Sequence, residues 1–467
     1  MPSRQLGPFK VSAIGLGCMN ICHAYGAPVS ELQAERLLLA ALDAGVSHFD
    51  TAALYGFGAS ETMVGKVLGP HRGKFTLACK CGMQGVDVAG DGKRVRVIDG
   101  RPETLKATCE AALKRLRTDV IDLYYLHRWD KQVPIEDSVG ALADLVRVGK
   151  IRAIGLSEVS ATTLQRAHAV HPIAALQTEY SLWTRNPEIA VLQACRELGV
   201  SFVAFSPVAR GFLCGPLDVN AFDAKDIRRT MPRFTPANYA RNQALLPPFN
   251  AIASEVGCTP SQLAIAWLLH QGDDILPIPG TTSVEHLLDD LGAANVRLSP
   301  EVLARLDALI NQNTVSGDRY SDQANREVDT EVFQRAVLGR LNHAPPQIHR
   351  QPQAARFRAA GGSAVRCRRR ESVGPGNSGA SGQARASWPQ AQHAPTASAL
   401  RPRRPRWPCA VQHRVVVREQ ADPRLQAHRP ARCPGARAVR PNRSSARPPR
   451  VQGHALIRNP APGTGHG

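Results

Sequence analysis

Short runs rich in β-branched and aromatic residues alternate with longer amphipathic segments between residues 11 and 291. The candidate strands are VSAIGLG, HFDTA, FTLACKC, VIDLYYLH, IRAIGLSE, AALQTEYS, VSFVAFSP and ILPIPG. Strands that alternate with helices indicate parallel pairing, because a parallel crossover needs about a dozen residues or more. Eight such units over roughly 280 residues predict a (β/α)8 TIM barrel, whose usual size is about 250 residues. A doubly wound open sheet is the alternative.

The candidate helices carry ordinary start and stop signals. The segment 30–44 begins with a serine that can cap its first turn, and 102–116 begins with a proline, which first turns tolerate. The other candidates are 60–68, 135–148, 162–169, 187–198, 242–256, 260–270, 284–291 and 300–311. The segment RQLGPFKVS, before the first strand, predicts an N-terminal hairpin that covers the bottom of the barrel.

The composition changes after residue 333. The 467-residue chain has a formal net charge of +19, from 58 Lys and Arg against 39 Asp and Glu. Residues 334–467 contain 25 arginines, no lysine and three acids, so residues 1–333 keep 33 basic and 36 acidic side chains. A chain as charged and proline-rich as this tail cannot bury enough apolar surface to fold. We therefore predict a folded domain at 1–333 and a disordered, low-complexity Arg/Pro-rich tail at 334–467.

The origin of the tail has two interpretations. Arginine without lysine fits a GC-rich coding region read in a shifted frame. The alternative is a basic tail that binds nucleic acid without sequence specificity, because only Trp388 and Trp407 could stack on bases there. For the rest of the chain we do not expect a nucleic-acid partner.

Other classes of protein are disfavoured by simple patterns. No apolar run reaches the ~18 residues that a membrane helix needs, so we expect no membrane partner. The eleven cysteines are irregularly spaced and lack zinc or redox motifs, which favours reduced thiols in a cytoplasmic protein and no metal site. The oligomeric state stays open.

Titratable side chains stand at the carboxyl ends of three neighbouring strands, where barrels carry their chemistry. Asp50 ends the second strand, with Tyr55 in the following loop, while Lys80 and His127 end the third and fourth. A buried lysine needs a carboxylate partner, and Asp50 is one strand away. The alternative is a structural ion pair with a histidine satisfied by backbone. Four such groups together favour a functional site.

These four residue types suit proton donation to a carbonyl oxygen. A free tyrosine has a pKa of about 10 and is a poor acid near neutrality. We expect the Lys80 ammonium to lower the pKa of Tyr55 and Asp50 to hold the lysine in place. Tyr55 would then protonate an alkoxide as it forms, and His127 would hydrogen-bond the phenol or the substrate oxygen.

The segments GVSHFDTAALYGFGASETMVGKVL, LACKCG and DLYYLHRWD resemble the aldo-keto reductase superfamily. The later segments GKIRAIGLSEVS, QTEYSLWTR and LPIPGTTSVEHL match it in the same order, and the likeness, over residues 4–329, is greatest to the YakC-like NADP-dependent branch. The resemblance implies a barrel that reduces aldehydes or ketones with NADPH and without metal. It places the catalytic tetrad on Asp50, Tyr55, Lys80 and His127. A nucleotide-binding regulatory subunit with the same fold and little turnover is the alternative.

The resemblance also implies where NADPH binds. Ser157 and Gln177 match contacts to the nicotinamide amide, and Phe205 matches the aromatic that stacks on its ring, although core packing explains Phe205 equally well. The other implied cofactor residues are Gly17, Cys18, Met19, Ser206, Pro207, Val208, Arg210, Gly211, Gly280, Thr281, Thr282, Ser283, His286, Asp289 and Asp290. Arg210 would offer charge to the pyrophosphate, and the helix start near Ser283 favours a phosphate.

Three departures from the family pattern weaken parts of this assignment. Glu158 replaces the asparagine that usually follows Ser157, and Asp290 replaces an asparagine that reads adenine. No Lys or Arg stands in the stretch that usually grips the 2′-phosphate, where His286 is present instead. The substrate is set by loops whose aromatic candidates, Tyr25, Trp129 and Trp183, are equally consistent with ordinary packing.

Overall fold

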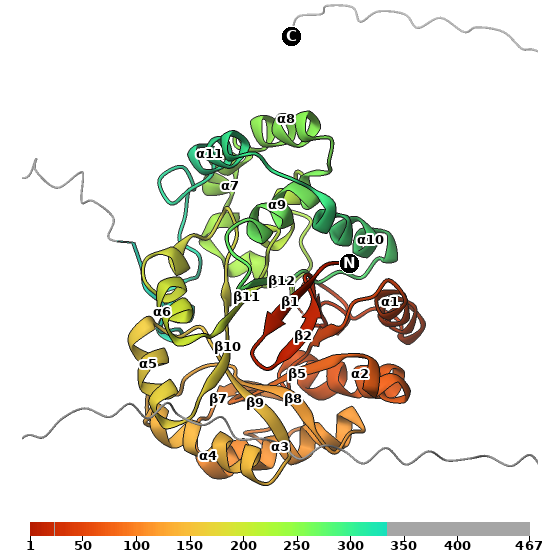
Figure 1. Ribbon diagram of the computed structural model, residues 1–467, viewed down its shortest axis with the longest axis vertical. Helices are drawn as coiled ribbons and strands as arrows, with labels where there is room; N and C mark the ends of the chain where they lie inside the picture. The colour runs from red at the N-terminus through yellow and green to blue at the C-terminus, as the bar shows by residue number, and fades with distance from the viewer. Residues whose placement is uncertain (23, 334–467) are drawn as a thin grey trace, which may run out of the picture. The chain divides into compact units, whose positions relative to one another are not determined.

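A computed structural model describes residues 1–22 and 24–333 of the chain, and the predicted disordered tail lies outside the described residues. Eight parallel strands form one sheet, in which each strand pairs with its neighbours along the chain (Figure 1). They are β3 (Leu16–Gly17), β4 (His48–Asp50), β5 (Thr76–Cys81), β8 (Ile121–Leu126), β9 (Ile151–Ser157), β10 (Ile173–Glu179), β11 (Ser201–Phe205) and β12 (Ile275–Ile278).

The sheet closes between its first and last strands. The N–H of Gly15 donates to the Pro277 carbonyl at 3.0 Å, and the N–H of Gly17 donates to the Pro279 carbonyl at 2.9 Å. A Cβ on Gly17 would lie only 3.1 Å from the Ile278 oxygen, so glycine permits this close approach. The (β/α)8 barrel is therefore confirmed, and the open-sheet alternative is wrong.

Helices surround the barrel, and side-chain caps define where several of them begin. Ser30 accepts the Gln33 N–H, and Thr259 forms a capping box with Gln262. The helices that follow or precede barrel strands are α1 (Glu31–Asp43), α2 (Ala59–Leu68), α3 (Pro102–Leu116), α4 (Ile135–Arg147), α5 (Ala161–Val170), α6 (Val191–Leu198), α9 (Pro260–Leu269) and α10 (Val284–Gly292). The remaining ones are α7 (Pro236–Gln243), α8 (Leu246–Val256), α11 (Pro300–Leu309) and α12 (Asp322–Arg326).

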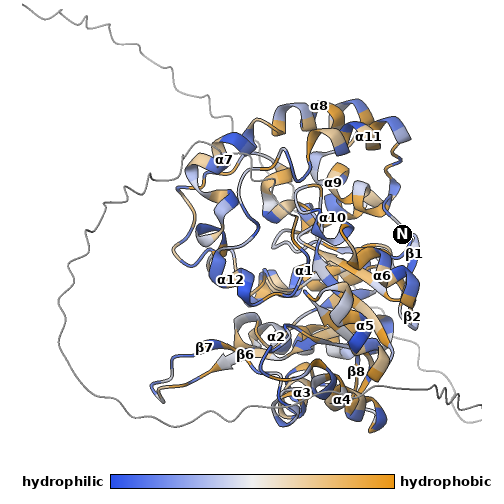
Figure 2. Cartoon of the chain, turned by 90° about the vertical axis from the view of Figure 1, so that its left-hand side faces the viewer, coloured by the Kyte–Doolittle hydropathy of each residue, from blue (hydrophilic) through white to orange (hydrophobic). Residues whose placement is uncertain are grey.

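Two sequence expectations were incomplete. The single helix predicted over 242–256 is interrupted, because Pro247 and Pro248 lie in the first turn of α8 and cannot continue a preceding helix. The loop after β5 also forms a hairpin of β6 (Met83–Val86) and β7 (Val95–Ile98), which projects from the barrel in Figure 2. The alternating valines of this segment indicate strands, although no strands had been predicted there.

The predicted N-terminal hairpin covers the bottom of the barrel. It consists of β1 (Ser3–Leu6) and β2 (Phe9–Ser12), and Leu6 and Val11 pack with side chains of the barrel interior. The Gly7 N–H donates to the hydroxyl of Ser201, the first residue of β11, at 2.9 Å. This position at the amino ends of the strands confirms the prediction.

The alternation of side chains along each strand positions the opposite end of the barrel. Ala78 belongs to the interior cluster, and Lys80, two residues later on β5, points to the same side. Ala175 and Gln177 are related in the same way on β10. The interior therefore changes from apolar to polar toward the carboxyl ends of the strands.

No helix in residues 1–22 and 24–333 is both long and apolar enough to cross a membrane. In this same part of the chain, His, Cys, Asp and Glu side chains form no group of three or more that could hold a metal ion.

Candidate active site

Lys80 joins Asp50 and Tyr55 at the carboxyl end of the barrel. Its ammonium forms a short ion pair with Asp50 Oδ1 and donates to the Thr51 carbonyl and the Tyr55 hydroxyl, both at 3.0 Å. The lysine side chain is fully buried, so its three N–H donors match three protein acceptors. The structure thus brings together three residues that the sequence predicted as one site.

Burial decides the pKa of each member of this cluster differently. Burial alone would lower the pKa of Lys80, but the Asp50 carboxylate and the Tyr55 oxygen outweigh it and raise that pKa, so the ammonium persists. Burial also raises the pKa of Tyr55 above its usual value, although the Lys80 ammonium opposes it. The expectation of a lowered tyrosine pKa is therefore wrong, and the phenol of Tyr55 keeps its proton at neutral pH.

The loop between β4 and α2 fixes Tyr55. Gly56, Phe57 and Gly58 have φ values of 58°, 52° and 97°, a left-handed turn that glycine favours. The rings of Tyr55 and His127 meet edge to face, with centroids 5.8 Å apart. His127, at the end of β8, therefore lies beside the phenol as the sequence predicted.

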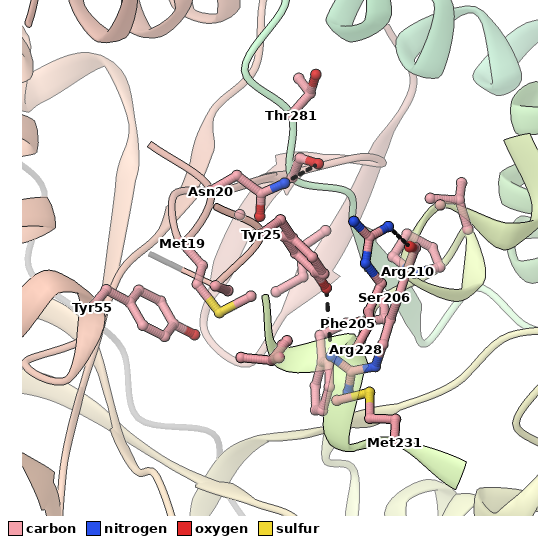
Figure 3. Close-up of a pocket in the computed structure, with 18 of the residues that line it drawn as sticks. Met19, Asn20, Tyr25, Tyr55, Phe205, Ser206, Arg210, Arg228, Met231 and Thr281 are labelled. Atoms are coloured by element: carbon pink, nitrogen blue, oxygen red, sulfur yellow. Dashed lines mark hydrogen bonds between the residues drawn. The ribbon is translucent and has the colours of Figure 1, made fainter. Parts of the chain in front are cut away.

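A cavity of about 1050 Å³ opens beside Tyr55 and His127 and extends to the start of α10. Figure 3 shows Tyr55 on one side of it, with Phe205, Arg228 and Met231 across from the phenol. This volume lies at the upper end of the range for small-molecule sites. The cavity is large enough for an extended ligand together with a small second one.

Most of the predicted cofactor residues line this cavity. They are Gly17, Met19, Ser157, Gln177, Phe205, Ser206, Pro207, Val208, Arg210, Gly211, Gly280, Thr281, Thr282, His286, Asp289 and Asp290. Cys18 does not, because it packs in the core around the barrel. Ser283 does not either, because its hydroxyl caps α10 by accepting the His286 N–H.

The two residues predicted to bind the nicotinamide amide, Ser157 and Gln177, are already hydrogen-bonded to other side chains of the site. Gln177 donates from Nε2 to Asp50 Oδ2 at 2.8 Å, which orients the side chain, and its carbonyl oxygen can act as an acceptor. The Ser157 hydroxyl accepts from Arg128 Nη1 at 3.3 Å. Both side chains are buried near the carboxyl ends of their strands.

Glu158 has a structural role that explains its departure from the family pattern. Its carboxylate accepts two hydrogen bonds from Arg319, at 3.1 and 2.5 Å, and a third from the Glu179 N–H at 3.0 Å. Its backbone is in the left-handed region, with φ of 58°. Glu158 is buried and does not line the cavity, so it is not placed to bind a ligand amide.

Arg210 lines the cavity, but its charge is already neutralised. Its Nη2 donates to Glu179 Oε2 at 2.5 Å and to the Tyr320 hydroxyl at 3.2 Å. The loop that carries it is strained, since Ser206, Ala209 and Arg210 all have φ between 52° and 58°. Such left-handed residues are typical of loops that bind ligands through their backbone.

The far end of the cavity is acidic. Asp289 accepts from Thr259 and Ser261 hydroxyls and from Gln262. Burial and the neighbouring Asp289 raise the pKa of Asp290 to about 7. His286, at the start of α10, also lines this end, as does Cys214, whose thiol pKa is raised by burial and by the nearby Asp290 and Asp289.

Several residues of the cavity had not been predicted from the sequence. Asn20 donates to the Gly280 carbonyl at 3.0 Å, and Arg228 donates to the Arg210 carbonyl at 3.1 Å (Figure 3). Arg96 of β7 forms a 2.6 Å ion pair with Glu327, and both line the cavity. The Asn20–Gly280 and Arg96–Glu327 contacts join residues 260 and 231 positions apart, and no local motif predicts such contacts.

Of the three aromatic residues considered for the substrate pocket, one lines the cavity and two do not. Tyr25 lines the cavity, and its hydroxyl lies 3.4 Å from Arg210 Nη1. Trp183 instead stacks on Phe212, with ring centroids 4.2 Å apart, and is buried in the core. Trp129 packs against that core and does not line the cavity either.

A closed barrel with a cavity and titratable side chains at the carboxyl ends of its strands is typical of α/β-barrel enzymes. A model of the Aldo/keto reductase family matches residues 13–311, and the chain belongs to this family. It is 42% identical over 313 residues to probable aldo-keto reductase 1 of Glycine max, covering 67% of this chain and 89% of that protein. The chain is therefore an oxidoreductase of a family that reduces carbonyl groups with nicotinamide cofactors.

Solved structures of the family are similar to this one. The glycerol dehydrogenase AKR11B4 from Gluconobacter oxydans aligns with a TM-score of 0.61 and 28% identity, covering 66% of this chain and 94% of that chain. The aldo-keto reductase AKR11C1 from Bacillus halodurans, in its holo form, aligns with a TM-score of 0.56 and 27% identity, covering 69% and 99%.

Proposed function

We propose that this protein is an NADPH-dependent oxidoreductase that reduces aldehydes or ketones to alcohols, with Tyr55 as the proton donor. The observation that carries the proposal is the 3.0 Å hydrogen bond between Lys80 and Tyr55 at one end of a cavity of about 1050 Å³. Bound NADPH would supply the hydride that the carbonyl carbon accepts.

The side chains of this protein would supply the proton and stabilise the negative charge that its transfer leaves behind. The substrate carbonyl would lie between Tyr55 and His127, and its oxygen would take the phenolic proton as the alkoxide forms. The raised pKa of Tyr55 keeps that proton available until then, and burial is its main cause. Lys80, held by Asp50, would stabilise the phenolate that remains until solvent returns the proton.

The proposed dinucleotide would take one orientation in the cavity. Ser157 and the Gln177 carbonyl would bind the nicotinamide amide near Tyr55, with Phe205 against the ring. The left-handed loop at 206–211 and the first turn of α10 would bind the phosphates, because helix starts present free N–H groups. The adenosine would then lie near His286 and Asp290.

Steady-state assays of the full chain test this function. NADPH and NADH oxidation would be measured against a panel of aldehydes, ketones and quinones, and we expect turnover with NADPH. A protein that retains nucleotide tightly but turns over none of the panel would instead support the regulatory-subunit alternative. The cytoplasmic location expected from the cysteine pattern is part of the proposal, and the eight cysteines of the described residues are all free thiols.

Cofactor choice needs its own measurement. His286 is the residue nearest the proposed 2′-phosphate site that can carry a positive charge, and histidine side chains in general change charge between pH 5 and pH 8. We expect a modest preference for NADPH over NADH that weakens between pH 6 and pH 8. His286→Arg should tighten NADPH more than NADH by roughly 1.5–3 kcal/mol. If NADPH and NADH bind with equal dissociation constants in both the unmodified enzyme and His286→Arg, this segment does not bind the 2′-phosphate.

A further inference from the structure

Four arginines line the cavity, and they differ in whether a carboxylate neutralises them. Three form ion pairs of 2.5–2.6 Å: Arg96 with Glu327, Arg210 with Glu179, and Arg228 with Asp226. Arg128 has no carboxylate within 4.0 Å among residues 1–22 and 24–333. The catalytic end of the cavity therefore holds one arginine whose charge the described protein leaves uncompensated.

The hydrogen bonds of Arg128 fix its guanidinium in place. Its Nη1 donates to the His127 carbonyl at 2.7 Å and to the Ser157 hydroxyl at 3.3 Å. Within the described part of the chain, Nε and Nη2 donate to no partner. These two groups share one edge of the planar guanidinium, and an arginine edge of this kind binds a carboxylate through two parallel hydrogen bonds.

The place of Arg128 separates it from the proposed phosphate sites. It directly follows His127, and it lines the same cavity as Tyr55. The segments proposed to bind phosphates are the loop at 206–211 and the start of α10, whereas the partners of Arg128 are at the ends of β8 and β9. An anion bound by Arg128 would therefore belong to the substrate.

We propose that Arg128 binds a carboxylate of the substrate, so that the preferred substrates are aldehydes or ketones that also carry a carboxylate. This inference rests on the proposed carbonyl reduction. The half-buried guanidinium is held by His127 and Ser157 before substrate arrives, so little ordering is needed on binding. Its position beside His127 would orient the carbonyl of such a substrate toward Tyr55.

Matched acid and ester substrates test the inference. The first pair is phenylglyoxylate and its methyl ester, and the second is 4-carboxybenzaldehyde and its methyl ester. For each pair, the ratio of kcat/KM for the acid to kcat/KM for the ester is measured. We expect a ratio above 1 in the unmodified enzyme for at least one pair. Arg128→Met should lower that ratio about 10- to 100-fold, as loss of a charged hydrogen bond does.

Two further variants separate charge, shape and folding. Arg128→Lys keeps the charge but not the planar fork, so its ratio should lie between those of the unmodified enzyme and Arg128→Met. The double variant Arg96→Met/Glu327→Gln removes an ion pair of the same cavity without changing its net charge, and its ratio should change by less than about twofold. A change in folding or NADPH binding alters both members of a pair alike and cancels in the ratio.

The possible failures are distinguishable. Reduction of the esters with ratios below 1, or a ratio that Arg128→Met leaves unchanged, would overturn the role of Arg128 while sustaining carbonyl reduction. No turnover of any acid or ester with NADPH or NADH would overturn both the proposed function and this inference.

Discussion

Glu158 and Arg319 form a buried, two-point ion pair although they are 161 residues apart in the sequence. The Asp329 N–H also donates to the Glu158 carbonyl at 3.0 Å. The pair thus fastens the segment after α11 to the end of β9, next to Ser157. Glu158, which departs from the family pattern at a predicted cofactor site, therefore binds the segment that contains Arg319 and Asp329.

Removing one member of this pair should destabilise the protein strongly. Arg319→Met would leave the Glu158 carboxylate buried without a counter-ion, which costs about 3–5 kcal/mol of unfolding free energy. Urea unfolding would measure it. The double variant Glu158→Gln/Arg319→Met should lose less than the sum of the single losses, because no unpaired charge remains. Strict additivity would show that the two side chains do not interact.

Tyr55→Phe should abolish reduction while sparing nucleotide binding. The variant keeps the ring against His127 but has no proton to donate, so kcat should fall about 10²–10⁴-fold. NADPH titration would show an unchanged dissociation constant. Tyr124→Phe is the matched control, since Tyr124 is buried in the core around the barrel and does not line the cavity. Near-normal turnover by Tyr55→Phe would remove the tyrosine from the mechanism.

Lys80→Met should lose both stability and activity. It leaves the buried Asp50 carboxylate without its ammonium, and we expect a loss of about 3–5 kcal/mol in unfolding free energy. Adding Asp50→Asn should recover part of that loss. Turnover should not return in the double variant, because no ammonium remains to hydrogen-bond the phenol of Tyr55. Recovery of activity would mean that Lys80 acts only as a structural partner.

Asp290 should make stability fall as pH rises. Its folded pKa of about 7, raised by burial and by Asp289, exceeds the reference of 3.8. Between these values the folded protein holds a proton that the unfolded chain releases, so the stability present at low pH is lost as pH rises through this window. Asp290→Asn removes the titration. The unfolding free energy of the variant minus that of the unmodified protein should be about 1–2.5 kcal/mol larger at pH 8 than at pH 5. An equal difference at both pH values would contradict the raised pKa of Asp290.

A chain ending at residue 333 should fold and reduce carbonyls like the full protein. The closing contacts of the barrel, the N-terminal hairpin and the Glu158–Arg319 pair are all complete within residues 1–333. Thermal unfolding and kcat/KM would be compared between the two lengths. A lower melting temperature or lost activity after truncation would show that the tail supports the domain.

Local sequence patterns were sufficient for the barrel and for the position of its polar end. Alternation along β5 determines that Lys80 shares a face with Ala78, and the order of strands puts Asp50 one strand away. Capping residues such as Ser30 mark helix starts for the same local reason. The single helix predicted over 242–256 was wrong because Pro247 and Pro248 lie in the first turn of a new helix, α8, and this signal was present in the sequence but not weighed.

The sequence by itself determined the period of the barrel and which residues stand at its strand ends, because those properties depend on neighbours a few positions apart. Only the tertiary structure decided which charges are neutralised, since Glu179 pairs with Arg210, Glu327 with Arg96, and Arg128 with no described carboxylate. It also decided the direction of the Tyr55 pKa, because desolvation depends on everything packed around the phenol. These ion pairs join residues 31 and 231 positions apart in the sequence, and no local pattern encodes contacts over such distances.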